Sequence, residues 1–183
     1  MLPIRQKLVG TDEKVPWSIL AAFQDLDARQ RVIRVCDNMV IRFWPDRQFE
    51  MHLCAFDQLE TPEMSKVAAR HVSRANMIII AFNADACLSP PVKRWMNKWR
   101  DYRQGREGTL IALIEGSPAN PALEKSHQDL RKVAHRAGLD YLTHEPAFAP
   151  APLSDEFGWY ERRAAEVGSV LGNILDRPFL PPS

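Results

Sequence analysis

Two unbroken apolar runs constrain the fold of this chain more than any other feature. Met77–Phe82 and Leu110–Ile114 consist entirely of apolar residues and have the length of a strand. A strand with one face in water alternates apolar and polar residues, whereas an unbroken run is typical of a central parallel strand covered on both faces. The two runs therefore predict a parallel sheet that lies between two layers of helices.

Segments of strand and helix pattern alternate along the rest of the chain. Strands are expected at 15–23, 47–56, 77–82, 109–114 and 141–143. Helices are expected to begin near Asp27, Thr61, Pro90 and Asn120. This alternation implies right-handed β-α-β crossovers and a parallel sheet. We predict a three-layer, doubly wound α/β fold with a mostly parallel five-stranded sheet of order 2-1-3-4-5, as in flavodoxin-like proteins.

The length of 183 residues fits one domain. We expect a flexible N-terminal segment at 1–14, a single α/β domain at 15–176 and a proline-rich tail at 177–183. Within the domain, a linker at 146–152 leads to an additional C-terminal helix over 154–175. The apolar load of that helix either covers an edge of the sheet or forms a homodimer contact.

Charge and apolar content narrow the class of partner. The chain has 24 basic and 23 acidic residues and a formal net charge of +1, so no overall charge attracts it to nucleic acid or to an acidic membrane. Met1–Lys14 lacks an apolar core of signal-peptide length, and the longest apolar runs are far below the ~20 residues that span a bilayer. We therefore expect a cytoplasmic protein without a membrane-spanning segment.

Several motifs of catalysis and cofactor binding are missing from the sequence. It contains no Gly-x-Gly-x-x-Gly, no phosphate-binding Gly-rich loop, no Gly-x-Ser-x-Gly and no His-Glu-x-x-His. Flavodoxin-type flavin binding would use a Ser- and Thr-rich loop after the first strand, and 24–28 is not such a loop. We predict no cofactor and no metal.

The cysteines Cys36, Cys54 and Cys87 form no Cys-x-x-Cys pair. We interpret them as small buried hydrophobes in a reducing compartment. One alternative stays open. Cys87 follows the third strand and His144 follows the fifth, so neighbouring loops could form a Cys–His dyad with an activated thiolate.

Polar side chains follow each predicted strand except the second. These candidates for a ligand or interaction site are Asp25, Asp27, Asn83, Asp85, Ser117 and His144. The carboxyl ends of parallel strands meet at one edge of the sheet, where ligands of such folds bind. The oxygen atoms of this rim could hold Mg²⁺. The alternative is ordinary loop polarity, with Asp25 or Asp27 capping the first helix.

The segment Ala137–Pro146 resembles the end of a response-regulator receiver domain, in which a helix ending in Ala-Gly leads to a short strand and a Lys-Pro pair. The resemblance implies that Asp25 and Asp27 match the acidic pair that follows the first strand of receivers. It also implies that Ser117 matches the Ser or Thr hydroxyl that follows their fourth strand.

Two positions depart from the receiver pattern. Asn83 stands nearest the phosphoaccepting Asp, and His144 replaces the Lys, with Glu145 inserted before the proline. An amide cannot accept a phosphoryl group as a carboxylate does. The resemblance therefore implies a pseudo-receiver, a flavodoxin-like domain that is not phosphorylated at the usual position.

Two further resemblances concern the third strand and the helix after it. The strand Ala75–Ala81 and the Val-Lys-Arg-Trp start of that helix are similar to uncharacterised bacterial proteins. More distantly, the strand resembles that of TIR and deoxyribosyltransferase domains, whose next helix bears a catalytic Glu. Lys93 and Arg94 stand in that helix instead, which argues against nucleoside chemistry.

The same helix is rich in basic residues, namely Lys93, Arg94, Lys98, Arg100 and Arg103. Trp95 and Trp99 fall at helical spacing with other apolar residues, which indicates core packing rather than a platform for stacking bases. We therefore predict a solvated basic surface that would suit an anionic partner protein better than nucleic acid.

From the sequence we expect a non-catalytic, receiver-like signalling or protein-interaction module with a protein partner. The alternative is a small-ligand-binding protein or an enzyme whose site lies at the carboxyl ends of the parallel strands.

Overall fold

The computed structural model describes residues 16–43, 48–86 and 88–143, which form a five-stranded sheet. The strand order is β2-β1-β3-β4-β5, and all neighbouring strands are parallel. The strands are β1 (Trp17–Phe23), β2 (Phe49–Ala55), β3 (Met77–Asn83), β4 (Gly108–Glu115) and β5 (Leu139–Thr143). The predicted α/β fold, its parallel sheet and the 2-1-3-4-5 order are confirmed.

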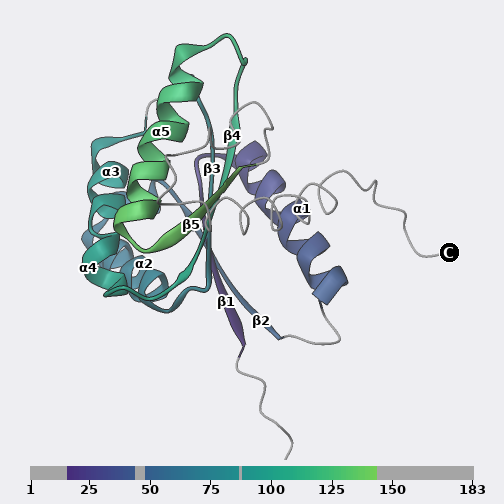
Figure 1. Ribbon diagram of the computed structural model, residues 1–183, viewed down its shortest axis with the longest axis vertical. Helices are drawn as coiled ribbons and strands as arrows, with labels where there is room; N and C mark the ends of the chain where they lie inside the picture. Colours follow the sequence, from purple (N-terminus) through teal and green to yellow (C-terminus); the bar gives the residue numbers. More distant parts are fainter. Residues whose placement is uncertain (1–15, 44–47, 87, 144–183) are drawn as a thin grey trace, which may run out of the picture.

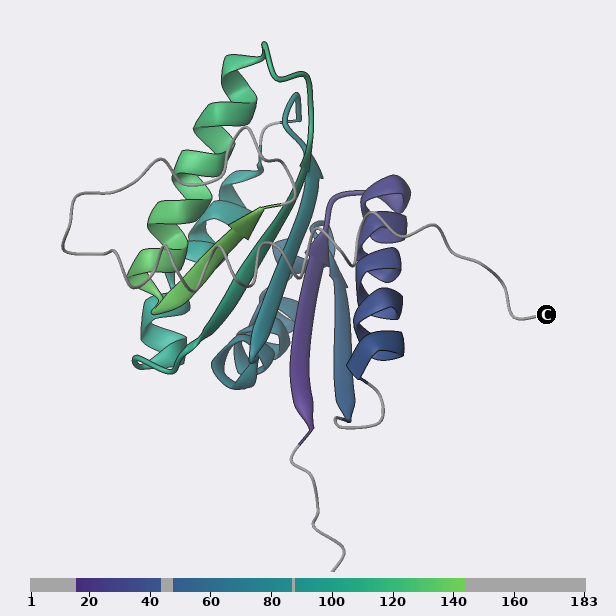
Figure 2. The same ribbon diagram turned by 45° about the vertical axis from the view of Figure 1, so that its right-hand side comes forward.

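Helices cover both faces of the sheet. They are α1 (Leu26–Phe43), α2 (Pro62–Arg74), α3 (Pro90–Asn97), α4 (Trp99–Arg103) and α5 (Pro121–Arg136), with a short 3-10 turn, η1 (Gln58–Glu60). Helix α1 lies on one face, and α2 to α5 lie on the other (Figures 1 and 2). The C-terminal helix predicted over 154–175, the segment 1–14 and the tail 177–183 lie outside the described residues.

Strand β3 shows why its sequence is apolar throughout. Ile78 and Ile80 point into the core beneath α2 to α5. Ile79 and Ala81 point into the core beneath α1. Successive side chains of a strand point to opposite faces, so a strand with helices on both sides needs apolar residues at every position.

The basic helix predicted from Pro90 onward is two helices that join at Lys98. Helix α3 ends at Asn97, and α4 begins at Trp99. Trp95 and Trp99 are both buried, with ring centroids 5.0 Å apart at 89°. This edge-to-face contact is core packing, as the helical spacing predicted.

Candidate functional site

The loops after β3 and β4 meet at the carboxyl edge of the sheet and are joined there by polar side chains. The backbone N–H of Asn83 donates to Gln24 Oε1 at 2.9 Å, and Asn83 Oδ1 accepts from the N–H of Asp85 at 2.9 Å. The Asn120 amide in turn donates to the Asp85 carboxylate. The structure thus brings Asn83 and Asp85 together, but their side chains already bond to other parts of the rim.

The other predicted rim residues take local roles. Asp25 Oδ1 accepts from the N–H of Ala28 at 2.8 Å and so caps α1, which is the alternative interpretation of this residue. Asp27 is exposed in the first turn of that helix. Ser117 is exposed in the turn before α5, and His144 lies outside the described residues.

Of the helices that begin at this edge, α1 and α5 are capped by side chains of the chain itself, and α3 begins with two prolines. An N-terminus attracts anions because its first N–H groups have no partner within the helix. The Asp25 carboxylate takes this place at α1. At α5, Asn120 Oδ1 accepts from the N–H of Ala122 at 2.9 Å. Helix α3 begins with Pro90 and Pro91, which have no N–H to offer.

Beyond the predicted set, an ion pair joins α1 to the end of β4. Arg31 donates to the Glu115 carboxylate, and its other terminal nitrogen lies 3.4 Å from the carbonyl oxygen of Phe82. These polar groups at the carboxyl edge therefore bond to each other within the chain. No local pattern indicates this pair, because the two side chains are 84 positions apart.

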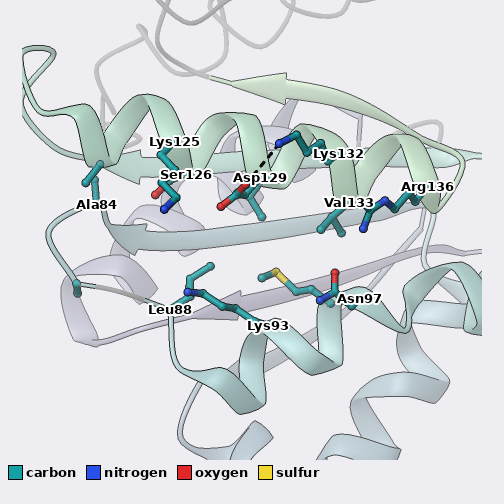
Figure 3. Close-up of a pocket in the computed structure, with 14 residues that line it drawn as sticks. Ala84, Leu88, Lys93, Asn97, Lys125, Ser126, Asp129, Lys132, Val133 and Arg136 are labelled. Carbon is teal, nitrogen blue, oxygen red and sulfur yellow. Dashed lines mark ion pairs between the residues drawn. The ribbon is translucent and has the colours of Figure 1, made fainter.

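A groove of about 430 Å³ opens beside this edge, between α3 and α5. Its lining includes Ala84 and Ala86, in the loop that follows β3. Its apolar wall includes Met96, Leu130 and Val133. Figure 3 shows residues of α3 and α5 facing each other across this groove. The groove therefore extends the carboxyl edge into a space that the described residues 16–43, 48–86 and 88–143 leave open.

Among the described residues, four cations and one carboxylate line the groove. Lys93 comes from α3, and Lys125, Lys132 and Arg136 come from α5. The carboxylate is that of Asp129, which lies 4.0 Å from Lys132 Nζ. The excess of cations gives the groove a positive potential that favours an anionic ligand.

The sequence pattern predicted that Lys93 is exposed, but it did not identify the cations of α5 as site residues. Lys125, Lys132 and Arg136 are separated by seven and four positions, so they lie along one side of a helix. That spacing was the available signal. The acidic residues Glu124 and Asp129 made it less conspicuous, because they offset half of the four Lys and Arg charges of the helix.

The predicted basic surface needs one correction. Lys93, Arg94, Lys98 and Arg100 are exposed, but Arg103 is buried, with 2% of its surface accessible. Its Nη1 donates to the carbonyls of Val72 and Ala75, and its Nη2 donates to those of Arg106 and Glu107, at 2.8–2.9 Å. Burial, together with the Arg106 cation, lowers the pKa of Arg103 to about 10. Arg103 is a structural residue, because its guanidinium joins the end of α2 to the turn before β4.

The described cysteines are poor nucleophiles. Burial, with a smaller effect of the Asp37 carboxylate, raises the pKa of Cys36 to about 12. Burial, with a smaller effect of Asp57, raises the pKa of Cys54 to about 11. Both thiols therefore stay protonated at neutral pH. The Cys87–His144 dyad lies outside the described residues.

Two classes of feature are missing from the part of the chain that the structure describes. Residues 16–43, 48–86 and 88–143 contain no group of three or more His, Cys, Asp or Glu side chains that could hold a metal ion. Among the same residues, no helix has both the length and the apolar content to cross a membrane.

Comparison with known proteins identifies the fold of this chain but not its activity. No protein-family model matches the sequence, and no curated protein matches it. An oxidoreductase from Corynebacterium diphtheriae has a similar structure, with a TM-score of 0.54 and 12% identity over 88% of this chain and 98% of that chain. A flavodiiron protein from Giardia intestinalis has a TM-score of 0.47 and 14% identity over 86% of this chain.

The chain spans 35% of the flavodiiron protein. At 12% identity, the likeness to the oxidoreductase shows a flavodoxin-like α/β fold and nothing finer. Neither of these two structures is described as a receiver.

A flavin phosphate does not fit the described part of the carboxyl edge. Only Gln24 and Asp25 separate β1 from α1, so this loop is too short to surround a phosphate group. The Asp25 carboxylate occupies the end of α1 and would repel an anion there. This edge therefore lacks a site for the phosphate group of a flavin among the described residues.

Proposed function

We propose that this protein is a small-ligand-binding domain that takes an anionic molecule with an apolar portion in the groove between α3 and α5. The observation that carries the proposal is the lining of that groove, in which four cations surround an apolar wall beside the carboxyl edge. This proposal extends the alternative drawn from the sequence, a small-ligand-binding protein or an enzyme with its site at the carboxyl ends of the strands. Because the protein of similar fold is named an oxidoreductase, a redox enzyme is one version of that alternative.

The chemistry of the two walls sets the class of ligand. The apolar side chains of Met96, Leu130 and Val133 would contact an apolar portion of the molecule, and Lys93 and Lys125 would contact its phosphate or carboxylate groups. Lysine ammonium groups bind phosphate as point charges without a fixed geometry. A phosphate- or carboxylate-bearing metabolite fits this description better than a cation or a neutral sugar.

Native mass spectrometry of the purified protein, compared with its denatured mass, tests for a co-purified ligand. Thermal unfolding then compares the protein with and without FMN, NADPH, ATP and coenzyme A, with inorganic phosphate as the minimal anion. A ligand at 100 times its Kd adds about 2.7 kcal/mol, which raises the Tm of a chain of this size by about 5–10 °C. If no adduct is found and no probe raises the Tm, the proposal is wrong.

Charge reversal locates the site. Lys93→Glu and Lys125→Glu should each weaken binding of the responding probe by about tenfold or more, because like charges would then face each other. Arg100→Glu is the matched control, since Arg100 is exposed on α4 and does not line the groove. Binding that survives both groove variants would place the ligand elsewhere.

The receiver-like module expected from the sequence has less support than this alternative. Asn83, at the phosphoacceptor position, uses its side-chain oxygen to hold the N–H of Asp85. Asp85, the remaining carboxylate, accepts from Asn120. A phosphoryl-mass adduct on Asp85 after treatment with a phosphodonor and Mg²⁺ would restore the receiver interpretation.

A further inference from the structure

Strand β2 forms one edge of the sheet and pairs with β1 alone among the described strands. Its sequence, Phe49–Ala55, contains neither Pro nor Lys, the residues that commonly protect edge strands. Its side chains Met51 and Leu53 are 44% and 43% exposed. An edge of this kind is a template for pairing with another strand.

The hydrogen bonds to β1 show which backbone groups of β2 point outward. The carbonyl of Gln48 accepts from Trp17, and the N–H of Phe56 donates to Phe23, both at 2.8 Å. Backbone groups of a strand alternate in direction, so the even-numbered residues of β2 face β1. The N–H and C=O groups of the odd-numbered residues therefore face away from the sheet.

One of these outward groups is already occupied. The N–H of Ala55 donates to Gln58 Oε1 at 3.0 Å. Phe49, Met51 and Leu53 remain, and no described residue pairs with the outward edge that they form. The edge that is open to a partner is thus short, and Met51 lies at its centre.

The two faces of this short edge are self-complementary. Phe49 packs against the core beneath α1, so Met51 and Leu53 share that face with it. Glu50 and His52 lie on the other face and bond to each other, with 3.1 Å between His52 Nε2 and Glu50 Oε1. Two copies paired antiparallel about Met51 would place Glu50 of each opposite His52 of the other.

We propose that β2 pairs antiparallel with β2 of a second copy of this chain, about a two-fold axis at Met51, to form a continuous ten-stranded sheet. Phe49 would lie opposite Leu53 on the apolar face, and three hydrogen-bonded residue pairs would give about six backbone hydrogen bonds. A second copy suits this edge because the two-fold axis places apolar residues opposite apolar residues and places each Glu50 opposite a His52.

Helix α2 adds apolar surface on the other face of the sheet, the face of Glu50 and His52. Its residue His71 stacks on His52, with ring centroids 3.5 Å apart. Met64 and Val67 precede His71 by seven and four positions, so they continue one stripe of the helix. Both are exposed. The surface proposed for the dimer is therefore the β2 edge together with this stripe.

This dimer surface is independent of the proposed ligand groove. Strand β2 and helix α5 belong to opposite ends of the sheet, because α5 packs mainly on β4 and β5. Dimerisation would leave the groove open in both copies.

Sedimentation equilibrium of the full chain at micromolar concentrations tests the proposal. We expect a reversible dimer. Met51→Lys should raise its Kd by about tenfold or more, because two ammonium groups would meet at the axis. Ile41→Lys is the matched control, since Ile41 is also an exposed apolar residue but lies on α1, and it should leave the Kd unchanged. Circular dichroism and the Tm confirm that each variant is folded.

A charge exchange tests the register. Glu50→Lys should weaken the dimer, and Glu50→Lys combined with His52→Glu should restore its Kd to within about threefold, because unlike charges again lie opposite each other. A monomer at every concentration, or a dimer that Met51→Lys does not weaken, overturns the proposed interface. A double variant that stays weak while folded overturns the register about Met51.

Discussion

Replacement of Arg103 by Met gives a sharp test of how this fold is held together. The guanidinium is 2% exposed and donates four hydrogen bonds, all to backbone carbonyls. Two of the acceptors, Val72 and Ala75, lie at the end of α2. The positive charge there also complements the negative end of that helix. No carboxylate of the described residues forms a salt bridge with Arg103.

The magnitude follows from these bonds. A hydrogen bond to a charged group contributes about 1.5–3 kcal/mol, but removal of the cation also removes the cost of burying it. We therefore expect Arg103→Met to lower the free energy of unfolding by about 3–5 kcal/mol. Arg103→Lys should lose about half as much, because one ammonium cannot reach both pairs of carbonyls.

Urea unfolding at 25 °C measures the loss. With a slope of about 2 kcal/mol per molar urea, Arg103→Met should lower the midpoint by about 1.5–2.5 M. Arg100→Met, at an exposed position of the same short helix, should change the unfolding free energy by less than about 0.5 kcal/mol. A midpoint for Arg103→Met within 0.5 M of the wild type would refute the reasoning.

Three other predictions concern separate elements. Burial and a neighbouring arginine lower the pKa of His127 to about 4, so its contribution to stability is present above pH 6.5 and is lost as the pH falls through 4. Urea unfolding at pH 7 and pH 5 should differ by on the order of 2 kcal/mol from this group, and the difference should shrink in His127→Gln. Gly108→Ala would place a Cβ 2.6 Å from Arg103 Nη2. The Cβ would also lie 2.8 Å from the backbone carbonyl oxygen of Asn76. The substitution should cost about 1–3 kcal/mol in the same assay, whereas an unchanged midpoint would show that both the guanidinium and this backbone can move. Asp25→Ala removes the cap on the Ala28 N–H and should lower the Tm by an amount equivalent to about 1 kcal/mol, with Asp25→Asn close to the wild type.

The sequence determined the fold because its strongest signals are local. The apolar run of β3 requires cover on both faces, and Pro62 with Glu63 marks the start of α2. Alternation of strands and helices then leaves few arrangements, because parallel crossovers are short and right-handed. The order 2-1-3-4-5 is the most economical of the arrangements that these rules leave.

The candidate site depended on contacts that no local pattern encodes. Asp25, Asn83 and Asp85 were found at the predicted edge, but their oxygens bond to the chain itself. Which polar groups remain available for a ligand depends on hydrogen bonds between loops that are distant in sequence. The groove likewise exists because α3 and α5 are held apart on the sheet.

Arg103 shows most clearly what the sequence pattern could not predict, namely the burial of one charged side chain. In the sequence it belongs to a basic run with Arg100 and Lys98 and looks like a surface residue. In the structure the helix breaks at Lys98, and the short helix that follows turns the Arg103 side chain toward the end of α2. Composition and periodicity set which segments are buried on average, whereas the burial of one charged side chain depends on acceptors that only the tertiary structure provides.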